Sequence, residues 1–178
     1  EIGSVDLGGT KAITGRKLEK EDNGVWQAVL YDSTGKELQR VDITKETSIF
    51  GDAGAEFNFE ALEFATKAKI DPTQIGYVYD DYSTPQTFTY YVKEERNPNL
   101  QDNGRTNGMT DDTVVYNVKI TVSDDGKGHL IIPAPELTRD DGSAVETMHF
   151  DNTFKADNTE FIEAHKKVTG TALEDKMF

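Results

Sequence analysis

The chain is dominated by short segments in which apolar and polar residues alternate, the period of two that is typical of half-buried β-strands. The clearest segment is 113–122, where valine, tyrosine and isoleucine occupy every even position. Turn residues at 123–128 follow it and lead into 129–132, which is predicted as the second strand of a hairpin. Further strands are predicted at 25–31, 36–43, 57–59, 88–92 and 148–154.

Short strands separated by turn clusters predict an all-β protein, with the architecture of an immunoglobulin-like β-sandwich and its Greek-key connections. One segment, 59–68, also fits a short helix, because Leu62, Ala65 and Thr66 fall near helical spacing. The aromatic residues of the same segment favour a strand equally. The pattern therefore leaves the structure of this segment open.

Acidic residues outnumber basic ones by 33 to 19, which gives a formal net charge of −14. Such a surface repels phosphate backbones and anionic lipids, so neither nucleic acid nor a membrane surface is an expected partner. The chain has no cysteine, so disulfides cannot restrain it. Because it has no run of about 18 apolar residues, no membrane insertion is predicted for this segment.

The two ends of the chain resemble each other. Residues 166–170 repeat the Lys-x-(Ile/Val)-Thr-Gly pattern of residues 11–15. The chain also opens at Glu1 without a signal peptide, so we expect it to be a piece of a larger protein. The predicted organisation is one β-sandwich domain at 1–156, followed at 157–178 by a linker and the first strand of a similar domain.

Three predicted strands each carry one polar residue in a row of side chains that is otherwise apolar. In the first strand, Lys11 follows Val5, Leu7 and Gly9 at every second position. In the second, Glu94 follows Phe88, Tyr90 and Val92 in the same way. In the third, Asn152 lies between Phe150 and Phe154. Successive residues of a strand point to opposite faces, so the amine, the acid and the amide are each expected on the core side. Burying a charged amine or acid without a partner costs several kcal/mol or forces the group to become neutral.

A buried amine, acid and amide can react with one another. A neutral lysine amine is a nucleophile, a carboxylic acid with a raised pKa can relay protons, and an asparagine amide can lose ammonia. Together they can form a Lys–Asn isopeptide bond. Each residue also has an ordinary interpretation, because Lys11 can reach water from a strand end, Glu94 can begin a loop, and Asn152 can be a hydrogen-bonded core amide. Alternation does not show that the three strands are neighbours, so it leaves these alternatives open.

Several segments, in order along residues 5–156, resemble the isopeptide-forming pilin and surface-protein domains of streptococci and other Gram-positive bacteria. Residues 10–18 are similar to their Lys-x-Leu-x-Gly-Arg-x-Leu first strand, and residues 87–95 to the tyrosine-rich strand that ends in the catalytic acid. Residues 150–154 are similar to the closing Phe-x-Asn-x-Tyr strand. Two further landmarks of these domains match at 107–118 and 122–126.

The resemblance implies a CnaB-like immunoglobulin fold and a role for each of the three polar residues. Lys11 becomes the nucleophile, Glu94 the catalytic acid and Asn152 the acceptor of the crosslink, and by the C-terminal repeat Lys166 becomes the nucleophile of a following domain. The neighbouring substitutes, if the register differs, are Lys17 and Glu95.

A structural function follows from the same resemblance. It implies a stalk domain of a cell-wall-anchored, extracellular surface protein or pilin, stabilised by the autocatalytic bond. The implied partners are neighbouring domains of the same polypeptide or other pilus subunits. Because one intramolecular turnover is the whole reaction, such a domain is not an enzyme in the ordinary sense.

A binding function is the alternative hypothesis. An adhesin module would engage a host protein or glycan through its loops, and exposed tyrosines are frequent in such binding surfaces. The candidates are the loop 97–108 and the irregular stretch 66–87, with Tyr77, Tyr79 and Tyr82.

Hydrolysis and metal chemistry are weaker hypotheses. Adjacent residues of a strand point to opposite faces, so neither pair of neighbouring aspartates, Asp80 with Asp81 or Asp111 with Asp112, makes a natural two-acid site. No ligand spacing connects the three histidines, which are His129, His149 and His165. No cofactor is predicted.

Overall fold

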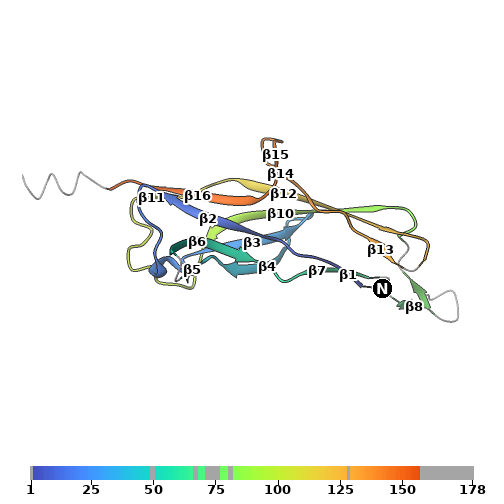
Figure 1. The fold of residues 1–178 in the computed structure, drawn as a ribbon. Helices are drawn as coiled ribbons and strands as arrows, with labels where there is room; N and C mark the ends of the chain where they lie inside the picture. Colours follow the sequence, from blue (N-terminus) through green and yellow to red (C-terminus); the bar gives the residue numbers. More distant parts are fainter. Residues whose placement is uncertain are drawn as a thin grey trace, which may run out of the picture.

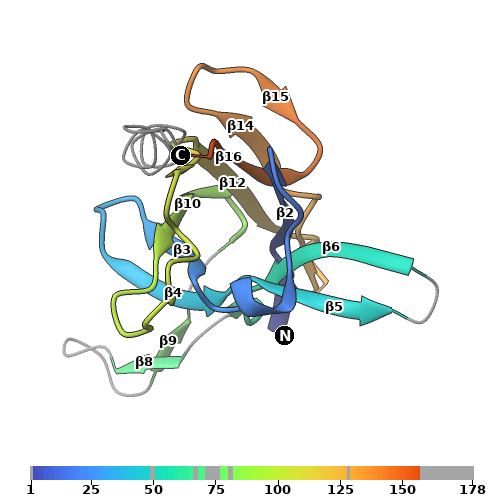
Figure 2. The ribbon, with the colours of Figure 1, turned by 90° about the vertical axis from the view of Figure 1, so that its left-hand side faces the viewer.

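Two β-sheets pack face to face in the computed structural model, which describes residues 2–48, 51–65, 68–70, 77–79, 82–127 and 129–156. Figure 2 shows the two layers, with β10, β3 and β4 on one side and β2, β6 and β5 on the other. The first sheet has the order β15-β14-β12-β10-β3-β4, with β13 paired to β12, and the second has the order β11-β16-β2-β6-β5. The predicted all-β sandwich is confirmed.

The strands of the first sheet are β3 (Trp26–Asp32), β4 (Glu37–Asp42), β10 (Gln86–Arg96), β12 (Val115–Asp124), β13 (Leu130–Ile131), β14 (Glu136–Arg139) and β15 (Ala144–Val145). Those of the second sheet are β2 (Gly8–Thr14), β5 (Thr44–Ser48), β6 (Gly51–Asn58), β11 (Met109–Thr110) and β16 (Met148–Phe154). Two separate pairs are β1 (Ile2–Val5) with β7 (Leu62–Ala65), and β8 (Ala68–Ile70) with β9 (Tyr77–Tyr79).

Helical structure is confined, within the described residues, to the short 3-10 turn η1 (Lys20–Asp22). The segment 59–68, which the sequence pattern left open, contains the strand β7 instead of a helix. In the part of the chain that the structure describes, no helix has the length and apolarity needed to cross a lipid bilayer.

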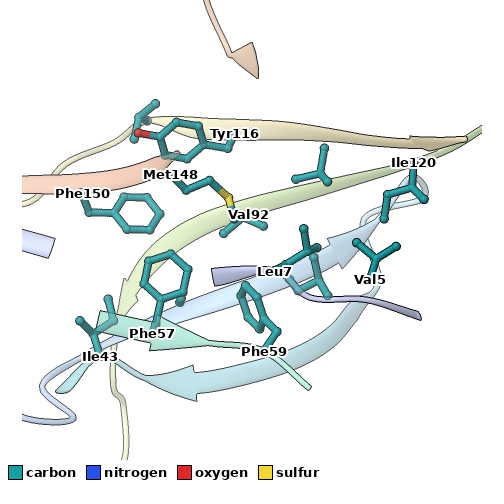
Figure 3. Close-up of a cluster of buried hydrophobic side chains, with 14 of the residues drawn as sticks. Val5, Leu7, Ile43, Phe57, Phe59, Val92, Tyr116, Ile120, Met148 and Phe150 are labelled. Carbon is teal, nitrogen blue, oxygen red and sulfur yellow. The ribbon is translucent and has the colours of Figure 1, made fainter. Parts of the chain in front are cut away.

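Alternation along β12 accounts for one side of the core. Tyr116, Val118, Ile120 and Val122 are all buried, whereas the side chains between them face outward or lie half-buried. Figure 3 shows Tyr116 and Phe150 approaching each other from the two sheets, and their ring centroids lie 5.6 Å apart. The Tyr116 hydroxyl also donates to the main-chain oxygen of His149 at 2.5 Å and accepts from the His149 N–H at 3.0 Å. This contact ties the first sheet to β16.

The strands β2 and β16 are the only parallel pair among the described residues, although they come from opposite ends of the chain. Lys11 is paired in register with Phe150, and Ile13 with Asn152. Gly15 then ends β2 with a φ of 102°, and a Cβ at this position would lie 2.1 Å from the Phe154 carbonyl oxygen. Only glycine tolerates both conditions, so this residue lets the ends of the two strands lie together.

A buried carboxylate fixes the long loop that follows β10. Asp22 on η1 accepts two hydrogen bonds from Arg16 and two from Arg105, at distances of 2.9 to 3.1 Å. Burial alone would raise the pKa of Asp22, but the two guanidinium groups outweigh it and lower that pKa to about 2. Arg105 belongs to the loop 97–108, so the ion cluster anchors this loop to the start of the domain.

Replacing Asp22 with asparagine is expected to lower the free energy of unfolding by about 2 kcal/mol at pH 7, since each pKa unit corresponds to about 1.4 kcal/mol. The lowered pKa means that Asp22 stabilises the fold above its usual pKa of 3.8 and loses this effect as the pH falls towards 2. Urea unfolding of the Asp22→Asn variant and the parent at several pH values measures the difference. Glu21→Gln, an exposed acid of the same turn, is the control. A difference that stays constant down to pH 2 would contradict this account.

Candidate functional site

Three strands bring the predicted amine, acid and amide together in the core. Lys11 lies in β2 and Asn152 in the neighbouring strand β16. The register partner of Lys11 is Phe150, and Asn152 lies two residues further along β16, so the side chains of Lys11 and Asn152 point to the same face of the second sheet. Glu94 comes from β10 in the facing sheet. All three residues are buried, with exposed fractions of 2% for Lys11, 9% for Glu94 and 0% for Asn152.

The Lys11 amine is held between a carboxyl group and an aromatic ring. Its Nζ lies 2.5 Å from Oε1 of Glu94, and the side chains of both residues are almost fully excluded from solvent. The same Nζ lies 4.6 Å from the centroid of the Trp26 ring, which belongs to β3 beside β10. The other Glu94 oxygen, Oε2, is buried and has no hydrogen-bond partner among the described residues.

Burial drives both members of this pair towards their neutral forms. Desolvation lowers the pKa of Lys11, and the charge and hydrogen bond of Glu94 only partly oppose it. Desolvation likewise raises the pKa of Glu94, while Lys11 and Asn152 partly oppose that rise. A neutral amine beside a protonated carboxyl group is the state in which lysine is nucleophilic and glutamate can donate a proton.

The Asn152 amide is fixed by the segment that joins β11 to β12. Its Oδ1 accepts a hydrogen bond from the main-chain N–H of Asp112 at 2.9 Å, and its Nδ2 donates to Oδ1 of Asp111 at 3.3 Å. The two contacts require an acceptor on one side of the amide and a donor on the other, so they determine which way the amide points.

The Asp111 carboxylate accepts hydrogen bonds from one cationic side chain and one neutral side chain. Arg96 donates to it through Nε at 2.6 Å and through Nη2 at 3.2 Å, and the Trp26 indole donates at 3.1 Å. Asp111 and Asp112 therefore belong to the site as supports of Asn152. Their roles escaped the sequence pattern because the contacts come from a loop, where side chains do not alternate.

The structure separates the substitute residues from this site. Lys17 is exposed, beyond the end of β2. Glu95 points to the outer face of β10, where it accepts a hydrogen bond from Tyr31 and forms an ion pair with Arg40 at 2.9 Å. The structure therefore brings together Lys11, Glu94 and Asn152 and not their neighbours.

Other predicted candidates are placed elsewhere or lie outside the description. Tyr82 is buried in the core cluster, so it is not an exposed binding residue. The side chains of Tyr77 and Tyr79, the pair Asp80 and Asp81, and Lys166 lie outside the described residues. The Lys166 role and the boundary at residue 156 stay predictions. Among the described residues no group of three or more His, Cys, Asp or Glu could hold a metal ion.

A β-sandwich in which β2 and β16 pair in parallel, and in which a lysine, an acid and an asparagine are buried between the sheets, has the groups that an isopeptide-containing domain requires. The chain belongs to one such family, described as FctA: Spy0128-like isopeptide containing domain, whose model matches residues 7–155. This match confirms the family resemblance seen in the sequence. The chain is thus a structural domain of the pilin type.

The solved structures that match this chain include two of major pilins from Streptococcus pyogenes. A mutant of the major pilin is 14% identical with a TM-score of 0.44, and the match covers 86% of this chain and 52% of that one. The major pilin protein (T-13) of serotype GAS131465 gives the same identity and TM-score, with 86% and 54% covered. This chain therefore spans about half the length of these pilins. No curated protein matches it.

Removing the Lys11 charge is expected to make the stability depend on pH through Glu94. In Lys11→Met the charge that opposes desolvation is gone, so the pKa of Glu94 rises further above its usual 4.5. An acid with a raised folded pKa stabilises the fold at low pH, and this effect is lost as the pH rises towards the folded pKa. We expect a fall of about 1.4 kcal/mol for each pH unit over this window.

Chemical unfolding between pH 4 and pH 9 measures this slope. The reference is the double variant Lys11→Met/Glu94→Gln, which lacks both titrating groups and also lacks the nucleophile. Parallel curves for the single and double variants would show that the Glu94 carboxyl is hydrated in the folded protein.

Proposed function

We propose that this domain crosslinks itself through an amide bond between Lys11 Nζ and Asn152 Cγ, and thereby carries tension as part of a surface fibre. The observation that carries the proposal is the buried contact of 2.5 Å between Lys11 and Glu94. Lys11 lies on β2, which pairs in parallel with β16, the strand of Asn152. Both pKa directions favour the neutral amine and the protonated acid that the reaction requires.

The reaction needs no external reagent. The lone pair of the neutral Lys11 amine attacks Cγ of Asn152, and the carbonyl electrons move to Oδ1. Glu94 accepts a proton from Nζ and transfers one to Nδ2, which leaves as ammonia when the carbonyl reforms. The products are one secondary amide and one ammonia, and Glu94 returns to its starting state. The buried Oε2 of Glu94, which has no partner among the described residues, supplies a second oxygen for this transfer.

The position of the bond suits a domain under tension. Figure 1 shows the N-terminus at one end of the elongated sandwich, whereas the described chain leaves β16 at the opposite end. Force between the two ends therefore shears β2 against β16, and their hydrogen bonds would carry it. A bond between Lys11 and Asn152 moves this force onto covalent bonds. We infer that the domain serves in a cell-wall-anchored pilus or surface protein, with neighbouring domains or subunits as its partners.

Intact mass tests the crosslink directly. The folded protein is expected to weigh one ammonia less than its sequence, and Lys11→Ala, Glu94→Gln and Asn152→Ala are each expected to show the full mass. The bond closes a loop from residue 11 to residue 152, so its absence should lower the free energy of unfolding by about 5 kcal/mol in the chain-entropy account.

The neighbouring residues provide matched controls. Lys17→Ala and Glu95→Gln remove the same functional groups outside the core, so both variants should lose the ammonia. Peptide mapping should then find Lys11 and Asn152 in one crosslinked peptide. Full mass for the folded, unmutated protein would refute the crosslink.

Pulling on single molecules tests the mechanical role. The unmutated domain, held at its two ends, should show no extension from the residues between Lys11 and Asn152. Glu94→Gln should unravel by on the order of 500 Å, at about 3.5 Å for each extended residue. Glu95→Gln should behave like the unmutated domain. Equal extension of the unmutated and Glu94→Gln domains would show that the bond does not carry the force.

A further inference from the structure

The main chain at Asp112 lies directly against the group that the proposed reaction transforms. Its N–H donates to Oδ1 of Asn152 at 2.9 Å, inside the range of an ordinary N–H···O bond. The Asn152 side chain is fully buried, so water does not compete for this contact. On attack by an amine, the negative charge of the tetrahedral intermediate develops on this same oxygen.

The Asp112 side chain holds that N–H in place. Its Oδ1 accepts from the N–H of Val114 at 3.0 Å, which closes a turn within the segment before β12. Its Oδ2 accepts from the N–H of Asp151 at 2.9 Å, which fastens the segment to the residue that precedes Asn152. One carboxylate therefore fixes both the donor and the strand that carries the acceptor.

Asp111 supports the other side of the amide. It accepts from Asn152 Nδ2, and its own charge is engaged by Arg96 and by the Trp26 indole. Because Nδ2 faces Asp111, the oxygen is the atom that faces the Asp112 N–H. The leaving nitrogen and the developing oxyanion are thus directed to different partners.

We propose that the Asp112 main-chain N–H is the oxyanion donor of the crosslinking reaction, and that the Asp112 side chain is the positioning group that holds it. The inference rests on the proposed function, since it concerns the same reaction. A fixed donor stabilises charge that forms only in the transition state, and no reorganisation is needed when the charge appears. Glu94 moves the protons, whereas Asp112 stabilises the oxygen.

Replacing the single N–H by oxygen tests this role. The α-hydroxy analogue of aspartate is introduced at position 112 by nonsense suppression during cell-free translation of the whole chain. The product, the position-112 ester, keeps the side chain and lacks the N–H donor. Samples taken over time and quenched in acid give the rate of ammonia loss by intact mass. We expect this rate to fall by about 100-fold, the loss that is typical when one oxyanion donor is removed.

The matched control is the same replacement at Thr113, whose N–H makes no described contact with Asn152. It should react at the rate of the unmodified chain. Rates measured across pH separate catalysis from loosening of the site, because loss of the donor lowers the rate at every pH without moving the midpoints set by Lys11 and Glu94. Loosening would admit water and move those midpoints towards the ordinary pKa values of lysine and glutamate.

Asp112→Ala provides a second test that needs only ordinary expression. It keeps the N–H and removes the side chain that holds it, so we expect a rate between those of the unmodified chain and the position-112 ester, with unchanged midpoints. Lys11→Met/Asp112→Ala, compared with Lys11→Met, reports the stability cost of the change without any crosslink.

Each outcome has one meaning. If the unmodified chain loses ammonia and the position-112 ester loses it equally fast, the oxyanion role is wrong and the proposed function stands. A slow reaction with shifted midpoints also overturns the role, since the site has then merely loosened. If the unmodified chain never loses ammonia, the proposed function itself fails.

Discussion

The desolvation of one lysine amine is the constraint on which the rest of this structure depends. Lys11 is buried between Glu94 and the Trp26 ring, where an ammonium group has lost its water. Burial lowers the pKa of this amine and raises that of its acid partner, so the pair tends to the neutral forms. An arrangement that is costly for a stable ion pair is therefore suitable for amide formation.

The surrounding fold supplies the geometry that this chemistry needs. Parallel pairing of β2 with β16 places Lys11 and Asn152 on the same face of the sheet, with Asn152 two residues beyond the partner of Lys11. Gly15 allows the ends of the two strands to lie together. Tyr116 ties β16 to the facing sheet, which presents the acid. Core packing and reactive geometry thus come from the same contacts.

Several elements were predictable because they depend on local alternation. The strand at 148–154 and the hairpin after β12 were predicted from the sequence and are confirmed. The short strands β14 and β15 were missed, because Pro133, Pro135 and an exposed turn interrupt any regular pattern there. The segment 59–68 fitted a helix by the spacing of its residues and a strand by its aromatic content, and the pairing of β7 with β1 decided for the strand.

The sequence by itself determined which residues of each strand share a face, because alternation is a property of the backbone that no partner strand can change. This was enough to select Lys11, Glu94 and Asn152. Only the tertiary structure decided that their strands meet, since pairing between residues 11 and 150 depends on the packing of the whole sandwich. It also decided the orientation of the Asn152 amide, because the contacts from Asp111 and Asp112 come from a loop whose path no local pattern specifies.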